Sequence, residues 1–255
     1  MADRQLDAYE AKLQDSAVDL KTKVQILVEI RDQAEQFCQP PTLQVFLQKF
    51  VPIFLDILSE PPVFTSNSNE QLYRLRPLEI FHRFPPSCDS QVLEPYAGQI
   101  MGKCLELCRV DNEDNAVLCL KVIMDFCRHH TRLPPVQEKA QPFLDLILDI
   151  FDGMDQTVKD TFDSSSGSLA AALPGSPNHS GTPGSPVTST ATSLADPAEH
   201  HATRPLIKGM QSFKVVAECP IIVVSVFQAF RNVVGKNVQA FTPRIKVALQ
   251  LEAEP

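Results

Sequence analysis

Tryptophan is absent from this chain of 255 residues, and glycine occurs only nine times. The glycines form no phosphate-binding loop, because Gly98 and Gly102 stand inside a helical pattern without the strand that precedes a P-loop. The catalytic-loop and metal-binding signatures of protein kinases are absent as well. No secretory signal is expected, since the chain is polar and charged from Asp3 onward. These absences argue against a nucleotide-dependent enzyme and against a secreted protein.

Basic residues are also few. The chain has 23 Lys and Arg against 31 Asp and Glu, a formal net charge of −8. Wrapping a nucleic acid backbone requires a basic face, so we expect no direct nucleic acid partner.

Long apolar runs are lacking too. The most apolar stretch is 208–230, but its uncharged part runs only from Cys219 to Phe230. A membrane span takes about 20 predominantly apolar residues, so we expect no membrane partner. The stretch instead predicts a core helix that is covered on more than one side. Pro220 predicts a kink or a short break in it near Glu218.

The seven cysteines are an odd number without the spacing of a secreted disulfide scaffold, which favours reduced thiols. Cysteine and histidine gather between residues 104 and 130, so a metal-dependent or Cys–His enzyme is an alternative. Cys119 and Cys127 are two turns apart in an apolar stripe, where cysteine packs as a small hydrophobe. Cys127 and His129 point to different sides of a helix. We therefore predict no metal, no cofactor and no catalytic residue.

Apolar residues recur at three- and four-residue steps along most of the chain, and no strand alternation appears. The fold class predicted from this pattern is all-α. The expected helices span 19–37, 42–58, 69–84, 91–110, 113–130, 137–162 and 208–230.

One stretch has a different composition. Residues 163–207 are rich in Ser, Thr, Pro and Gly, which cannot bury enough apolar surface to offset the entropy of ordering. We predict a disordered insertion there, between helical repeats over 1–162 and their continuation over 208–255. Ser176, Thr182 and Ser185 each precede a proline in it, and they are candidate phosphorylation sites.

A proline motif repeats along the helices. An apolar residue stands two before, two after and six after each of Pro52, Pro95, Pro142 and Pro243. The prolines lie 43, 47 and 101 residues apart, and the last gap is interpreted as two repeats once part of the insertion is discounted. Helical pairs that repeat every 40–47 residues are typical of HEAT and armadillo proteins. The sequence therefore predicts a HEAT-type α-solenoid, with an irregular helical bundle as the alternative.

Surface recognition is the function class that remains. The scarce basic residues gather on two predicted second helices of repeats, and second helices line the concave face of a solenoid. Such a groove would suit an acidic amphipathic segment that folds on binding, although an ordinary solvated face is the alternative. The candidate partner-binding residues are Arg74, Arg83, Lys121, Arg128, His129 and His130.

Three stretches, 71–85, 111–126 and 212–224, read QLYRLRPLEIFHRFP, DNEDNAVLCLKVIMDF and SFKVVAECPIIVV. They resemble the N-terminal HEAT region of the TRRAP family, the large pseudokinases related to phosphatidylinositol-3-kinase-like kinases. The resemblance runs in register over about 43–251 and does not include the Ser/Pro-rich stretch.

The resemblance implies a nuclear, non-catalytic scaffold shared by SAGA-type and MYST-type histone acetyltransferase complexes and contacted by the activation domains of transcription activators. It also implies that the chain is an N-terminal fragment, whose partners include other complex subunits and the remainder of its own long chain. Another HEAT scaffold, such as a transport receptor or a kinase-regulatory subunit, is the alternative.

Overall fold

The computed structural model describes residues 2–154, 157 and 213–250, and in these residues the regular structure is helical, with no strand. The all-α prediction is confirmed. The helices are α1 (Ala2–Gln14), α2 (Leu20–Asp32), α3 (Ala34–Phe37), α4 (Thr42–Ser59), α5 (Asn69–Arg83), α6 (Ser90–Val110), α7 (Glu113–His129), α8 (Pro134–Asp152), α10 (Lys214–Ala229) and α11 (Arg231–Gln250). The predicted insertion and its three candidate phosphorylation sites, Ser176, Thr182 and Ser185, lie outside the described residues.

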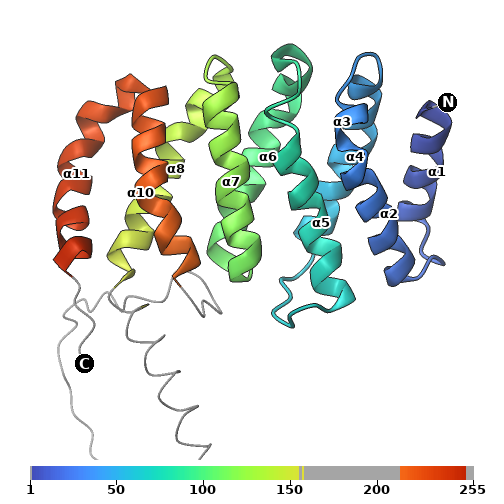
Figure 1. Ribbon diagram of the computed structural model, residues 1–255, viewed down its shortest axis with the longest axis horizontal. Helices are drawn as coiled ribbons and strands as arrows, with labels where there is room; N and C mark the ends of the chain where they lie inside the picture. Colours follow the sequence, from blue (N-terminus) through green and yellow to red (C-terminus); the bar gives the residue numbers. More distant parts are fainter. Residues whose placement is uncertain (1, 155–156, 158–212, 251–255) are drawn as a thin grey trace, which may run out of the picture.

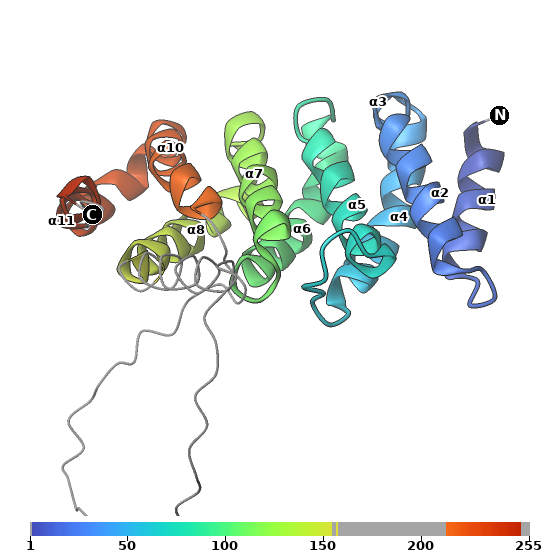
Figure 2. The ribbon, with the colours of Figure 1, turned by 60° about the horizontal axis from the view of Figure 1, so that its bottom comes forward.

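The helices stand side by side in chain order as a two-layered solenoid (Figures 1 and 2). In the first layer α1 packs on α4, α4 on α6, α6 on α8 and α8 on α11. In the second layer α2 packs on α5, α5 on α7 and α7 on α10. Each helix therefore contacts its partner in the pair and its equivalents in the adjacent pairs, which is the HEAT-type arrangement that the sequence predicts.

Polar residues fix where several helices begin. The side chains of Asp19, Ser68 and Asn112 accept a hydrogen bond from the backbone N–H three residues later, at 3.0, 3.1 and 3.0 Å. Asp89 accepts from the N–H of Gln91 at 2.8 Å. Each cap satisfies one of the donors that the first turn of a helix leaves unpaired. The cap at Asn112 begins α7 at Glu113.

The proline motif marks one layer. Pro52, Pro95, Pro142 and Pro243 lie in α4, α6, α8 and α11, all of them first-layer helices, and all four prolines are exposed. The interpretation of the last gap as two repeats is wrong. Since α11 packs directly on α8, the 101 residues between the last two prolines hold one repeat and the stretch that contains residues 158–212.

Two other boundaries differ from the prediction. The expected helix over 19–37 divides at Gln33, whose backbone leaves the helical region, so that α3 turns the chain toward α4. In contrast, α10 is one continuous helix through Pro220, so of the two predicted outcomes there the short break does not occur. Among the described residues α4 is the helix long and apolar enough to cross a membrane, but half of it is buried inside the molecule, as in a core helix of a globular protein.

Aromatic rings connect the layers at both ends of the array. Phe46 of α4 stacks on Phe37 of α3 and meets Phe84 edge-on, with ring centroids 5.2 and 5.3 Å apart. Near the other end Phe241 of α11 lies edge-on to Phe151 of α8 and Phe227 of α10, at 6.2 and 5.9 Å. Aromatic pairs in these arrangements contribute about 0.5–1.5 kcal/mol beyond the burial of their area.

A charged network lies inside the solenoid between the second and third helix pairs. The guanidinium of Arg74, a residue that is 1% exposed, donates to Asp111 Oδ2 at 2.5 Å and to the carbonyls of Ile57 and Glu60 at 3.2 and 2.6 Å. Asp111 is fully buried in the turn between α6 and α7. Arg74 therefore connects the end of α4, the helix α5 and the α6–α7 turn.

The second oxygen of this carboxylate is also satisfied. Asp111 Oδ1 accepts hydrogen bonds from the backbone N–H of Asn112 and from the side-chain amide of Asn115, at 2.8 and 3.1 Å. The amide of Asn112 donates to the carbonyl of Val63 at 2.9 Å, which holds the α4–α5 loop on the same turn. Both oxygens of Asp111 are thus paired, which makes the buried ion pair tolerable, although Arg74 Nε and Asn115 Oδ1 have no hydrogen-bond partner among the described residues.

Removal of the buried cation should therefore destabilise the fold strongly. We expect Arg74→Met to lower the free energy of unfolding by about 3–5 kcal/mol, because Asp111 is left as an uncompensated buried charge. The matched control is Arg109→Met, which breaks an exposed pair with Asp149 and should cost no more than about 1 kcal/mol. Urea denaturation measures both, and equal losses in the two variants would contradict the role assigned to Arg74.

Candidate protein-interaction surface

Polar contacts join neighbouring helices of the second layer on the side that faces away from the first layer, which we call the outward side. Between α2 and α5, Arg31 Nη1 lies 3.0 Å from Glu79 Oε2. Between α5 and α7, His82 Nδ1 lies 2.6 Å from Asp125 Oδ2. The two atoms are close enough for a hydrogen bond, but their angle does not allow one. Contacts of this kind occur at each step of the layer and fix how the helices align.

The step from α7 to α10 has three such contacts. Asp114 meets Lys214 at 3.1 Å, Lys121 meets Glu218 at 3.7 Å, and Arg128 Nη2 donates to Ser225 Oγ at 3.4 Å. The α7 residues are seven apart, which is two helical turns, and their partners follow in the same order. The two helices therefore run parallel, as equivalent helices of successive repeats do.

A strip of apolar side chains lies on the outward side of α10. It consists of Ala217, Pro220, Ile221 and Val224, all of them exposed, and we call it the α10 strip. Ile221 and Val224 are 57% and 56% exposed, the largest values among the exposed large hydrophobic residues that the structure describes. The buried side of α10, with Val215, Cys219, Ile222 and Val226, faces the core instead.

The α10 strip borders two cations of α7. Ile221 follows Glu218 by one turn and precedes Ser225 by one turn, and these two residues are the partners of Lys121 and Arg128. Ile221 therefore lies between the ends of the two basic side chains. As predicted, the helix is covered on more than one side, because α10 packs on α7, α8 and α11. No described element packs on its outward side.

The six candidate partner-binding residues separate into two groups. Lys121, Arg128 and His129 are exposed on α7, and Arg83 is exposed in the last turn of α5. These four are brought to one side of the solenoid, where a partner can reach them, and they stay candidates.

Arg74 and His130 require a correction. Both are buried, at 1% and 4% exposure, so neither can contact a partner in this conformation. Arg74 is the cation of the internal network described above. His130 follows the end of α7 and fastens it to the neighbouring α5–α6 turn.

The contacts of His130 define its tautomer. Its Nε2 lies 2.6 Å from the carbonyl oxygen of Pro85, which can only accept, so Nε2 carries the proton. Its Nδ1 lies 2.8 Å from Ser90 Oγ and accepts from that hydroxyl. Burial lowers the pKa of His130, and the Pro85 carbonyl opposes this only in part. The imidazole is therefore a neutral structural element that closes a turn.

The cysteines of α6, α7 and α10 are core residues. Cys104, Cys108, Cys119 and Cys219 are at most 1% exposed. Burial raises the pKa of the Cys119 thiol well above its usual range, and that of Cys219 to about 12. The described residues contain no group of three or more His, Cys, Asp and Glu side chains that could hold a metal ion.

The chain is 27% identical to the transformation/transcription domain-associated protein of Danio rerio over 248 residues, 97% of this chain. It is 25% identical to the SAGA complex/NuA4 acetyltransferase complex subunit TRA1 of Saccharomyces cerevisiae over 97% of this chain, and 29% identical to Tra1 of Schizosaccharomyces pombe over 98%. The chain is similar to one segment of the TRRAP/Tra1 proteins. The resemblance read from the three sequence stretches is thus confirmed.

The chain spans about 6% of the length of these TRRAP/Tra1 relatives, 7% for the Saccharomyces protein. No family model matches it. The relatives are named as transcription-associated proteins and as subunits of acetyltransferase complexes, and none of these names describes an enzyme activity of the subunit itself.

The burial of His130 predicts a pH-dependent stability. Because its pKa is lowered in the folded protein, the unfolded chain binds the proton more readily. The contribution of neutral His130 to the free energy of unfolding is complete above the ordinary pKa of histidine, near 6.5. This contribution is lost as the pH falls from there through the lowered pKa of the folded protein. Between pH 7 and pH 5 we expect the free energy of unfolding to fall more steeply with pH for the wild type than for His130→Gln. The difference between the two slopes should be a part of about 1.4 kcal/mol per pH unit, which is the slope for the uptake of one whole proton.

Urea titrations at each pH give this slope. The matched variant is His129→Gln, which changes the exposed neighbour. It should retain most of the wild-type slope, because burial, and not the charge of His129, is the largest cause of the lowered pKa of His130. A His130→Gln protein with the same slope as the wild type would show that the protonation of His130 does not limit stability in acid.

Proposed function

We propose that this chain is a non-catalytic scaffold segment of a nuclear transcription coactivator, a subunit shared by SAGA-type and MYST-type (NuA4-like) histone acetyltransferase complexes. The names of the relatives support the complex, and the helical solenoid supports the scaffold role, because solenoids offer extended surfaces to partners. Its other contacts are with further subunits of the complex and with the remainder of a long chain.

We infer that acidic activation domains bind on the outward side of α7 and α10. The observation that carries this proposal is the α10 strip, in which Ile221 and Val224 are exposed beside Lys121 and Arg128. Amphipathic helices bind such surfaces with apolar anchors at positions i, i+3 and i+4. A segment with acidic residues on the flank of such an apolar face would match both features.

The polar contacts between α7 and α10 are weak enough to be exchanged for contacts with a binding partner. Lys121 is 3.7 Å from Glu218, and the hydrogen bond from Arg128 to Ser225 is long at 3.4 Å. Exposed contacts of this kind contribute about 0–1 kcal/mol, so a carboxylate of a partner can compete for either cation at little cost. Arg83 and His129 extend the basic surface along the same side.

The energies predict a weak complex. Full burial of an isoleucine or valine side chain contributes about 1.5–3 kcal/mol, and these two are already partly covered. The partner must also become ordered when it folds on binding, which costs about 2–5 kcal/mol or more. The dissociation constant is therefore expected on the order of micromolar or weaker.

A fluorescence-anisotropy titration tests this surface. The ligand is a labelled peptide with leucine or phenylalanine at helical spacing and aspartate or glutamate between them, and a scrambled peptide of the same composition is the control. We expect saturable binding that Ile221→Ser/Val224→Ser weakens at least about tenfold, since the exposed apolar anchors are lost. We expect a similar loss for Lys121→Glu/Arg128→Glu, which places like charges opposite the peptide.

Matched variants separate the surface from the overall charge. Arg109→Glu/Arg244→Glu makes the same charge change at first-layer contacts, and Val247→Ser removes an exposed apolar side chain of α11. Both should bind as the wild type does. Equal binding of the scrambled peptide, or an equal loss in the first-layer variants, would contradict a docking site on α7 and α10.

A further inference from the structure

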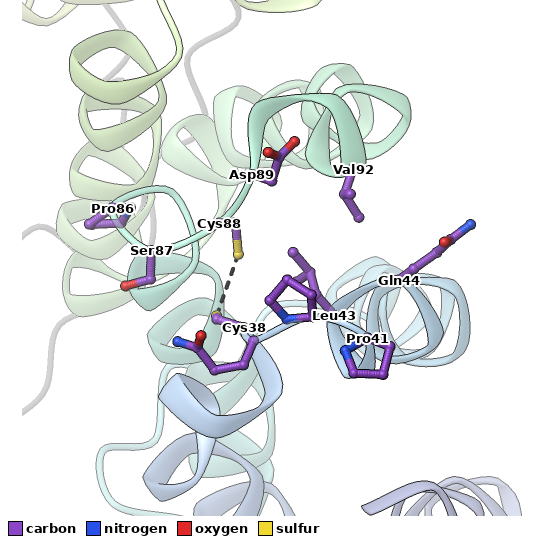
Figure 3. A pocket seen from close by; sticks show the side chains of 11 residues that line it. Cys38, Pro41, Leu43, Gln44, Pro86, Ser87, Cys88, Asp89 and Val92 are labelled. Carbon is purple, nitrogen blue, oxygen red and sulfur yellow. Dashed lines mark hydrogen bonds between the residues drawn. The ribbon is translucent and has the colours of Figure 1, made fainter.

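Two cysteines that are distant in the sequence meet at one edge of the solenoid. The sulfur atoms of Cys38 and Cys88 lie 3.4 Å apart, with the Cys88 thiol donating to the sulfur of Cys38. Cys38 ends α3, and Cys88 precedes the N-cap of α6 (Figure 3). Figure 3 shows the two sulfur atoms pointing toward each other.

The pair lines a surface pocket. The pocket has a volume of about 440 Å³ and is formed by the turns that precede α4 and α6, with Pro41, Pro86 and Val92 on its walls (Figure 3). Cys88 is half-buried, whereas the five cysteines of α6, α7 and α10 are at most 1% exposed. Cys38 is itself buried, at 3% exposure, but it lines the pocket with Cys88, so a small solute in the pocket meets the sulfur pair at the edge of the core.

The two thiols are chemically unequal. The hydrogen bond from Cys88 lowers the pKa of Cys38, and burial opposes this only in part. The same interaction, together with burial, raises the pKa of Cys88. The thiolate is the nucleophilic form of cysteine, so Cys38 is the sulfur that reacts first and Cys88 is the one that resolves the product.

The remaining thiols are less reactive toward an oxidant than this pair. Burial raises the pKa of Cys127 to about 12, so that only about one thiol in 10⁵ is ionised at pH 7. Cys119 also lies near other sulfurs, but it is fully buried with its pKa raised well above the usual range. Proximity of two sulfurs is therefore not sufficient for oxidation. Cys38 and Cys88 differ from the thiols of α6, α7 and α10 because they line the pocket.

We propose that Cys38 and Cys88 are a peroxide-responsive modification site, at which hydrogen peroxide converts the two thiols into a disulfide. The Cys38 thiolate attacks one oxygen of the peroxide and breaks the O–O bond, and the hydroxide that leaves takes up a proton as water. Cys38 is then a sulfenic acid. The Cys88 sulfur attacks the Cys38 sulfur, the S–O bond breaks, and the leaving hydroxide takes the Cys88 proton as a second water. Two thiols are oxidised by two electrons, and one peroxide is reduced to two waters.

The closure needs little movement. A disulfide is about 2.05 Å long, so the sulfurs must approach by about 1.4 Å. Both cysteines lie in connections between helix pairs, where side-chain rotation and small shifts of a turn can supply this distance. The bond would join the connection before α4 to the connection before α6. Disulfides inside cells are usually transient and redox-sensing, which fits a reversible bond at an accessible edge.

Counting thiols after oxidation tests the proposal. The folded 255-residue chain is treated with hydrogen peroxide, the peroxide is removed with catalase, and the chain is unfolded in N-ethylmaleimide before its intact mass is measured. We expect seven adducts before oxidation, five after it, and seven again after dithiothreitol. Peptide mapping should find the 38–88 disulfide. Seven adducts throughout, or a disulfide among Cys104, Cys108 and Cys119, would overturn the proposal.

Two single variants complete the test. Cys88→Ser removes the resolving thiol, so no disulfide should form and dimedone should label a sulfenic acid on Cys38. Cys127→Ser removes a core thiol and should still lose two adducts, from six to four. If Cys88→Ser lost two adducts as well, or if dimedone labelled a different cysteine, the assignment of the pair would be wrong.

Discussion

The contact of Arg74 with Asp111 sets the geometry of the middle of this solenoid. An isolated carboxylate in a core without exposed surface is strongly unfavourable, so Asp111 can occupy the α6–α7 turn only where a guanidinium meets it. Arg74 reaches it from α5 while donating to the end of α4. The requirement to pair one charge thereby fixes the relative positions of two helix pairs, and apolar packing fills the space around them. A sideways shift of either pair would leave the charge unpaired.

The remaining charges have a different role. Between successive second-layer helices they form exposed contacts, such as Arg31 with Glu79 and Lys121 with Glu218, which align neighbours but contribute little energy each. Since these contacts are weak and open to solvent, they can be exchanged for contacts with another chain. Alignment of the helices and availability to a partner are therefore compatible on one surface, and the α10 strip adds the apolar area that the charges alone do not supply.

The sequence was sufficient for much of the fold. Helical spacing and the proline motif predicted the helices and the repeat, because these signals are local. The candidate site was less predictable. Arg74 stands at a position that looks polar and exposed, and its partner lies 37 residues away in the chain. Ile221 looks like a core residue from its apolarity, although no described element covers it. The approach of Cys38 to Cys88, 50 residues apart, has no local signal at all.

The prolines of the first layer lead to a conclusion about water. A proline within a helix has no N–H, so the carbonyl four residues earlier loses its helical donor. For Pro52, Pro95, Pro142 and Pro243 those carbonyls belong to Gln48, Gln91, Glu138 and Gln239, and every one of these residues is exposed. These positions therefore lie on the exposed side of each helix, where solvent can supply the missing donor. The repeated motif thus places each missing backbone hydrogen bond of the first-layer helices at a position that water can reach.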